Sequence, residues 1–170
     1  VSLSGNNQSY QRVDHFKYLT SDPNRKSEKA NNIGYQIKGG ANYNLNANHN
    51  VFANLGYLEK APIFEAVFGG YQNKINTDAV NEKILSYELG YGYRTQKVSA
   101  NLNLYRTSWN DRSTNSTIYV QATEQFYTVN MSGVDALHQG IEFDFKYVPV
   151  HGVTLNGMVS VGDWKWTSNV

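Results

Sequence analysis

Apolar and polar residues alternate with a period of two along several stretches of this chain. In residues 33–45 the apolar set is Ile33, Tyr35, Ile37, Ala41, Tyr43 and Leu45, and the residues between them are mainly Gly, Gln, Lys and Asn. Successive side chains of a β-strand point to opposite faces, so this pattern predicts a strand with one apolar face. The pattern recurs over residues 51–57, 85–93, 98–104, 141–147 and 153–161, with a weaker copy within residues 1–16. We therefore expect an all-β fold of about seven antiparallel strands.

The connections between these predicted strands alternate strictly between short and long. Residues 46–50, 94–97 and 149–152 are tight turns, whereas residues 18–32, 59–83 and 111–136 are long polar or mixed segments. In an up-and-down sheet successive connections fall at opposite ends, so the short turns share one end and the long loops share the other. This asymmetry is typical of outer-membrane barrels, which have short periplasmic turns and long extracellular loops.

Strand length and hydropathy agree with a membrane barrel. About ten residues of a tilted strand cross an apolar band of about 25 Å, and residues 84–93 have this length. The mean hydropathy of -0.56 looks soluble, but a membrane strand exposes only every second residue to lipid. The expected fold is thus an antiparallel up-and-down transmembrane β-barrel in the bacterial outer membrane, present here as an incomplete sector of about seven strands.

The two faces of the predicted strands carry different functional groups. The aromatic girdle expected at the two membrane interfaces comprises Tyr43, Tyr91, Tyr93 and Tyr147 near the short turns, with Tyr57 and Trp109 near the long loops. The opposite face carries Glu88, Glu142, Asp144 and Lys146. A soluble core accepts such charges only when they are paired, whereas a wide, wet lumen accepts them readily. We predict that these four side chains face the lumen.

Composition and motifs argue against several other functions. Lys and Arg total 15 against 14 Asp and Glu, and no basic run interleaves with aromatic residues, so nucleic acid is not an expected partner. The chain has no Cys, its four His residues lack metal-ligand spacing, and no catalytic motif such as Gly-x-Ser-x-Gly is present. We predict no enzyme activity, no cofactor and no metal site; Asp14 and His15 are interpreted as a solvated pair.

Three segments carry a resemblance to a known family. They are Asn50-Val-Phe-Ala-Asn-Leu-Gly-Tyr-Leu-Glu-Lys-Ala-Pro-Ile-Phe64, Asn81-Glu-Lys-Ile-Leu-Ser-Tyr-Glu-Leu-Gly-Tyr91 and His138-Gln-Gly-Ile-Glu-Phe-Asp-Phe145. In this order and spacing they resemble the barrel of TonB-dependent outer-membrane receptors, in particular those of Bacteroidetes-type bacteria. The resemblance covers essentially all of residues 1–170. We interpret the chain as the carboxy-terminal part of a single barrel domain, without the plug domain.

The resemblance implies a 22-stranded barrel filled by an amino-terminal plug. Such receptors take up a scarce nutrient, such as siderophore-bound iron, cobalamin or an oligosaccharide, with energy that TonB transmits to the plug. The implied partners are outer-membrane lipid, the rest of the barrel and plug, TonB acting through that plug, and a small-molecule nutrient. Because residues 168–170 lack the terminal aromatic residue of the outer-membrane assembly signal, we expect further strands to follow.

Two long segments contain apolar residues on the predicted extracellular side. In residues 59–83, Phe64, Phe68 and Tyr71 either contact a ligand above the plug or pack loop against loop, for example around a short helix that caps the barrel. Residues 111–136 include two apolar runs, 118–120 and 126–129, which suit a hairpin rising above the membrane.

Two other functions are compatible with the sequence pattern. One is a barrel that does not transport by TonB, such as a porin or an adhesin, which would lack an upstream plug. The other is a soluble carbohydrate-binding β-sandwich, in which the apolar face would pack against a second sheet.

Overall fold

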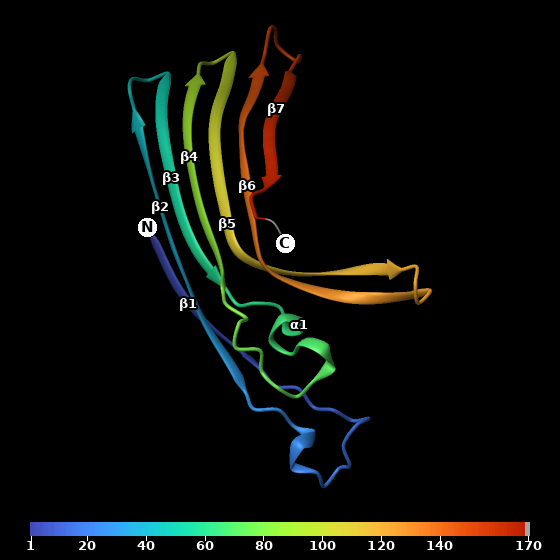
Figure 1. Cartoon of the computed structure of the whole chain (residues 1–170). Helices are drawn as coiled ribbons and strands as arrows, with labels where there is room; N and C mark the ends of the chain where they lie inside the picture. Colours follow the sequence, from blue (N-terminus) through green and yellow to red (C-terminus); the bar gives the residue numbers. More distant parts are fainter. Residues whose placement is uncertain (169–170) are drawn as a thin grey trace.

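A computed structural model describes residues 1–168, apart from the side chain of Tyr71, and places seven strands in one antiparallel sheet. The strands are β1 Ser2–Tyr10, β2 Ala30–Asn44, β3 His49–Lys60, β4 Glu82–Arg94, β5 Val98–Val120, β6 Gln125–Tyr147 and β7 Leu155–Trp166. Each strand pairs with its neighbours in sequence, so the order is β1 to β7 (Figure 1). The up-and-down all-β sheet predicted from the alternation is confirmed. Residues 169–170 of the predicted terminal segment lie outside the described residues.

The connections fall at the two ends of the sheet as predicted. Short turns join β2 to β3, β4 to β5 and β6 to β7 at one end (Figure 1). At the other end, the β1–β2 connection holds the 3-10 helix η1 (Pro23–Arg25), and the β3–β4 connection holds α1 (Phe64–Val67) and η2 (Gly69–Tyr71). The helices are all short: in the described chain none has the length and apolar character to span a membrane.

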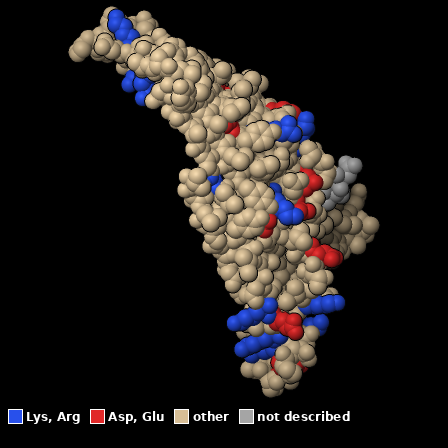
Figure 2. Space-filling model, turned by 90° about the vertical axis from the view of Figure 1, so that its left-hand side faces the viewer, with Lys and Arg blue, Asp and Glu red and all other residues tan. Residues whose placement is uncertain are grey.

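The pairing register places the predicted apolar residues on one face of the sheet. Tyr57 of β3 pairs with Ile37 of β2 and Leu85 of β4, and the same face continues through Leu104 and Ile141. Many of these side chains are exposed, and in the described part of the chain no second sheet covers them. Figure 2 views the convex side, where Lys, Arg, Asp and Glu lie at the loop end and along one edge, with further Lys and Arg at the turn end. This single open sheet agrees with the predicted barrel sector and not with a two-sheet sandwich formed within residues 1–168.

One predicted girdle residue lies on the opposite face. The five tyrosines of the predicted girdle share the convex, apolar face: Tyr43, Tyr57, Tyr91, Tyr93 and Tyr147. Trp109 instead pairs with Ile84 and shares the concave face with Glu88. Its position is odd-numbered, whereas the apolar residues of β5, such as Leu102 and Leu104, are even-numbered. The prediction that Trp109 belongs to the girdle is wrong because strand parity points it inward.

The segment predicted as a long loop at residues 111–136 is mostly strand. β5 and β6 are each 23 residues long and form a hairpin that extends to Val120 and Gln125, as the two apolar runs suggested. Its distal part turns sharply toward the concave side of the sheet (Figure 1). The pairing shifts register between Trp109 and Thr114, and Asp111 has a φ of 58°. Such an irregularity bends a strand and increases its twist.

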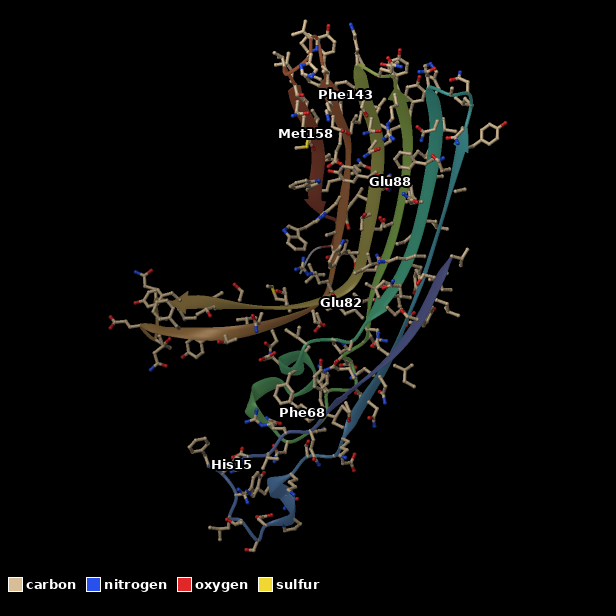
Figure 3. All side chains as sticks on the ribbon, turned by 180° about the vertical axis from the view of Figure 1, so that it is seen from behind. His15, Phe68, Glu82, Glu88, Phe143 and Met158 are labelled. Atoms are coloured by element: carbon tan, nitrogen blue, oxygen red, sulfur yellow. The ribbon has the colours of Figure 1, made fainter. Side chains whose placement is uncertain are left out.

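A buried carboxylate stabilises this bend. Glu82, at the start of β4, is only 1% exposed and lies where the distal hairpin leaves the sheet (Figure 3). Its Oε1 accepts the backbone N–H of Ser113 at 3.1 Å, and its Oε2 lies 3.5 Å from Nζ of Lys60. A second carboxylate, that of Asp135, accepts the backbone N–H of Asp111 at 3.0 Å. Both bonds satisfy backbone groups that the irregular register would otherwise leave unpaired.

We predict that Glu82→Ala loosens the distal hairpin. The substitution leaves the Ser113 N–H without its acceptor, which costs about 1–3 kcal/mol for a buried donor. Hydrogen exchange measured by mass spectrometry should become about tenfold or more faster over residues 112–134 in the full-length protein. Glu82→Gln keeps an acceptor oxygen and should have a smaller effect, and Glu65→Ala, at an exposed residue of α1, should have none. Equal exchange in Glu82→Ala and Glu65→Ala would contradict this role.

Candidate functional site on the concave wall

The concave face of the sheet is a polar wall whose charged groups are held by amide neighbours. The register puts the four residues predicted to face the lumen on this face: Glu88, Glu142, Asp144 and Lys146. Oε2 of Glu88 accepts from Nδ2 of Asn54 at 2.9 Å, and Oδ1 of Asp144 accepts from Nδ2 of Asn101 at 3.0 Å. Glu88 lies midway along β4 (Figure 3). Cross-strand hydrogen bonds of this kind hold charge on the wall without burying it in an apolar core.

An aromatic cluster occupies the loop end of the same wall. We define the wall cluster as Tyr105, Trp109, Arg112, His138, Trp164 and Trp166, which come from β5, β6 and β7. The ring of His138 lies between two indoles, with centroid distances of 6.3 Å to Trp109 and 5.8 Å to Trp164. The guanidinium of Arg112 lies 5.2 Å from the ring centre of Trp109 and 5.8 Å from that of Trp166. All three tryptophans of the chain thus meet in one place.

Small residues between the strands make room for these rings. Ala136, only 3% exposed, pairs with Trp109 on one side and with Trp166 on the other. Gly140 pairs with Tyr105 and with Gly162, and the Trp164 indole N–H donates to the Tyr105 hydroxyl at 2.9 Å across them. A Cβ on Gly140 would lie 2.6 Å from the carbonyl oxygen of Val161 and 2.7 Å from the Tyr105 hydroxyl oxygen. The glycines are therefore required by the aromatic groups that cross them.

The exposed indoles make this cluster suited to binding. In the described sheet β7 is the edge strand, and there Trp164 is 67% exposed and Trp166 is 61% exposed. Strand parity points both rings to the concave side. The adjacent Arg112 contributes a positive charge and five N–H donors. An indole face stacks on rings and apolar surfaces, and its attraction for cations holds the guanidinium in place. The arrangement can bind a ring-shaped or planar ligand.

A metal site needs several ligating side chains close together. Across residues 1–168, no group of three or more His, Asp or Glu side chains is arranged to hold an ion. His15 lies in the β1–β2 connection, where its Nδ1 is 2.7 Å from Nη2 of Arg25 (Figure 3).

The loop aromatics predicted as possible ligand contacts mainly pack against one another. Phe68 is 3% exposed and forms a small core with Val67 and Ala30, against which Phe64 and Tyr10 pack. The Phe64 ring centre is 5.1 Å from that of Phe68 and 5.8 Å from that of Tyr10. Figure 3 shows Phe68 beside the short helix and away from Glu88. This burial favours packing for Phe68; the side chain of Tyr71 is outside the described part.

The wall cluster was missed by the sequence reasoning, although a signal for it exists. In β7 the apolar convex residues are odd-numbered, such as Val159 and Val161, whereas Trp164 and Trp166 are even-numbered. Extending the parity of each strand to its loop end would have placed the tryptophans on the concave face. Proximity to the long loops alone suggests an interfacial girdle for Trp109 instead.

We predict that Gly140→Ala destabilises the sheet at this cluster. The added methyl group cannot be accommodated without moving the Val161 backbone or the Tyr105 ring, and overpacking of this kind costs about 1–3 kcal/mol. A matched control is Gly56→Ala, which is on the same face and whose Cβ would meet Lys38 Cγ at an ordinary 3.5 Å. Thermal unfolding of the full-length protein in detergent, followed by gel mobility, should show a lower midpoint only for Gly140→Ala. Equal midpoints would contradict the packing argument.

Comparison with known proteins agrees with the architecture. The family model described as "TonB dependent receptor-like, beta-barrel" matches residues 11–170. A search of curated proteins finds no match. Among solved structures, "Copper transporter OprC" superposes with a TM-score of 0.71 at 17% sequence identity, covering 96% of this chain and 26% of that one. The chain thus spans about a quarter of that structure, which shares its fold. With nearly all its residues matched by the family model, this outer-membrane chain belongs to the TonB-dependent receptor β-barrel family.

Proposed function

We propose that this chain forms one wall of an outer-membrane receptor for TonB-energised uptake of a scarce nutrient, and that the wall cluster contacts the nutrient. Family membership supports transport as the general function. The observation that carries the site assignment is the convergence of three tryptophans and Arg112 on the concave face at the loop end. Ligands enter such barrels from the extracellular side, which is where the long loops lie.

The chemistry of the cluster restricts the kind of nutrient. Exposed indole faces favour ligands with ring faces, and Arg112 favours ligands with oxygen acceptors. Siderophore-bound iron, cobalamin and an oligosaccharide each provide both features. Our proposal therefore covers all three classes of nutrient. The copper in the name of the similar structure is not carried over, since 17% identity supports the fold alone.

The β5–β6 hairpin has the position of a cover over this wall. Its distal part turns toward the concave side, and Nδ2 of Asn130 donates to the carbonyl oxygen of Glu65 at 2.9 Å, which ties it to α1 (Figure 1). We propose that the hairpin and α1 together limit access to the wall cluster from the extracellular side. Residues on extracellular loops commonly carry such roles in scaffolds of this kind.

We predict that replacing both exposed indoles, Trp164→Ala with Trp166→Ala, lowers nutrient binding by the full-length receptor. Loss of two stacking surfaces should weaken affinity by about tenfold or more, because truncated aromatic contacts commonly cost over 1 kcal/mol each. The nutrient is first identified by growth of a deletion strain on a panel of sources. Uptake is then measured with the complementing wild-type and variant genes.

Met158→Ala provides the matched control. Met158 lies on the same face of the same strand, is also exposed, and is outside the wall cluster (Figure 3). Uptake should remain near wild type in this variant. If the double tryptophan variant reaches the outer membrane in normal amount and takes up the nutrient at the wild-type rate, the wall cluster is not the contact site.

A further inference from the structure

An open cavity lies away from the concave wall, among the connections at the loop end. It has a volume of about 530 Å³ and is lined by the β1–β2 connection and by residues 72–75 of the β3–β4 connection. This size is within the range of pockets that bind small molecules. Figure 2 shows Lys and Arg side chains gathered at the loop end of the molecule.

Three lysines from separate parts of these connections line the cavity. They are Lys17, Lys26 and Lys74, and none of the ion pairs found in residues 1–168 involves them. The ammonium of Lys17 lies 5.6 Å from the ring centre of Tyr18, which also lines the cavity. Three positive charges brought together without paired carboxylates favour binding of an anion.

The two carboxylates of the lining do not cancel this charge. Asp14 is buried, and its Oδ1 accepts the backbone N–H groups of Lys17 at 2.8 Å and Phe16 at 2.9 Å. These two hydrogen bonds, with the nearby charges of Arg12 and Lys17, hold the pKa of Asp14 below its ordinary value. Asp14 thus holds its own turn and faces Arg12 as well as Lys17. The lining still has three lysines against two carboxylates, which leaves an excess of positive charge.

An amide of the cavity lining holds the two connections together and retains an unused acceptor. Nδ2 of Asn73 donates to the carbonyl oxygens of Asn24 and Arg25, each at 2.8 Å. Its Oδ1 is buried and has no hydrogen-bond partner among residues 1–168. A buried amide oxygen without a donor is unfavourable, and a hydroxyl group of a ligand can satisfy it.

We propose that this cavity binds a phosphorylated sugar. The lysines supply point charges for the phosphate, Asn73 supplies an acceptor for a sugar hydroxyl, and Tyr18 supplies a ring face. Two sources offer this chemistry at the extracellular side: a free sugar phosphate, and the phosphorylated sugars of lipopolysaccharide in the surrounding leaflet. The inference is independent of the proposed transport function and of the wall cluster.

The test is calorimetric titration of the full-length receptor in detergent at low salt. Glucose 6-phosphate should bind, and it should bind more tightly than inorganic phosphate, which brings no sugar hydroxyl to Asn73. The double variant Lys26→Ala with Lys74→Ala should weaken glucose 6-phosphate binding by about tenfold or more, since charge-assisted contacts are the strong ones. Added salt should weaken binding to the wild-type protein.

The matched control carries two other lysines changed to alanine, Lys29→Ala with Lys97→Ala. Lys29 is in the β1–β2 connection outside the cavity lining, and Lys97 is in a turn at the opposite end of the sheet. This variant should bind glucose 6-phosphate as the wild type does. Equal affinities in the two double variants would overturn the proposal.

Lipopolysaccharide, with and without its phosphate groups, separates the two sources. If the variant Lys26→Ala with Lys74→Ala loses binding of phosphorylated lipopolysaccharide, and the control variant keeps it, the ligand comes from the membrane leaflet. The form of lipopolysaccharide without phosphate groups should then bind neither variant more tightly than the other. Binding of glucose 6-phosphate without binding of lipopolysaccharide would assign it to a free solute. Absence of binding to either would overturn the proposal.

Discussion

Hydrocarbon offers no hydrogen-bond partner for a backbone N–H or C=O group, so each group within the membrane must be paired inside the protein. The continuous antiparallel pairing from β1 to β7 meets this requirement between neighbouring strands. It also fixes the directions of the side chains, because a one-residue slip would exchange the convex and concave faces. The apolar surface toward lipid and the polar wall therefore follow from the same ladder.

Where the ladder becomes irregular, polar side chains take over the pairing. At the bend of the β5–β6 hairpin, Glu82 and Asp135 accept backbone N–H groups that the shifted register leaves free. The concave wall is adapted differently: Gly140 and Gly162 have no side chains, so Tyr105 and Trp164 can meet across them. Charge, small residues and aromatic rings thus have separate structural roles at the loop end.

Much of the fold was predictable because period-two alternation is a local property. It placed the strands, and the connection lengths gave the two ends. Trp109 shows the limit: it lies at the end of a strand near a long loop, which suggested a girdle, but its parity is that of the polar face. Burial of Glu82 was not predictable, since it depends on Lys60 and Ser113 from distant parts of the chain. The resemblance motifs contain both Lys60 and Glu82, yet spacing alone does not indicate that they meet.

The orientation that this ladder implies is that the convex face meets lipid while the concave face meets water. It can be tested along β4 by single cysteine substitutions in the full-length receptor reconstituted in vesicles, using spin labels. Leu85, Leu89 and Tyr91 should be accessible to oxygen dissolved in lipid, whereas Ile84, Ser86 and Glu88 should be accessible to a water-soluble relaxation agent. A period of two with this phase would support this orientation of the sheet. Equal accessibility at all six positions, or the opposite phase, would contradict it.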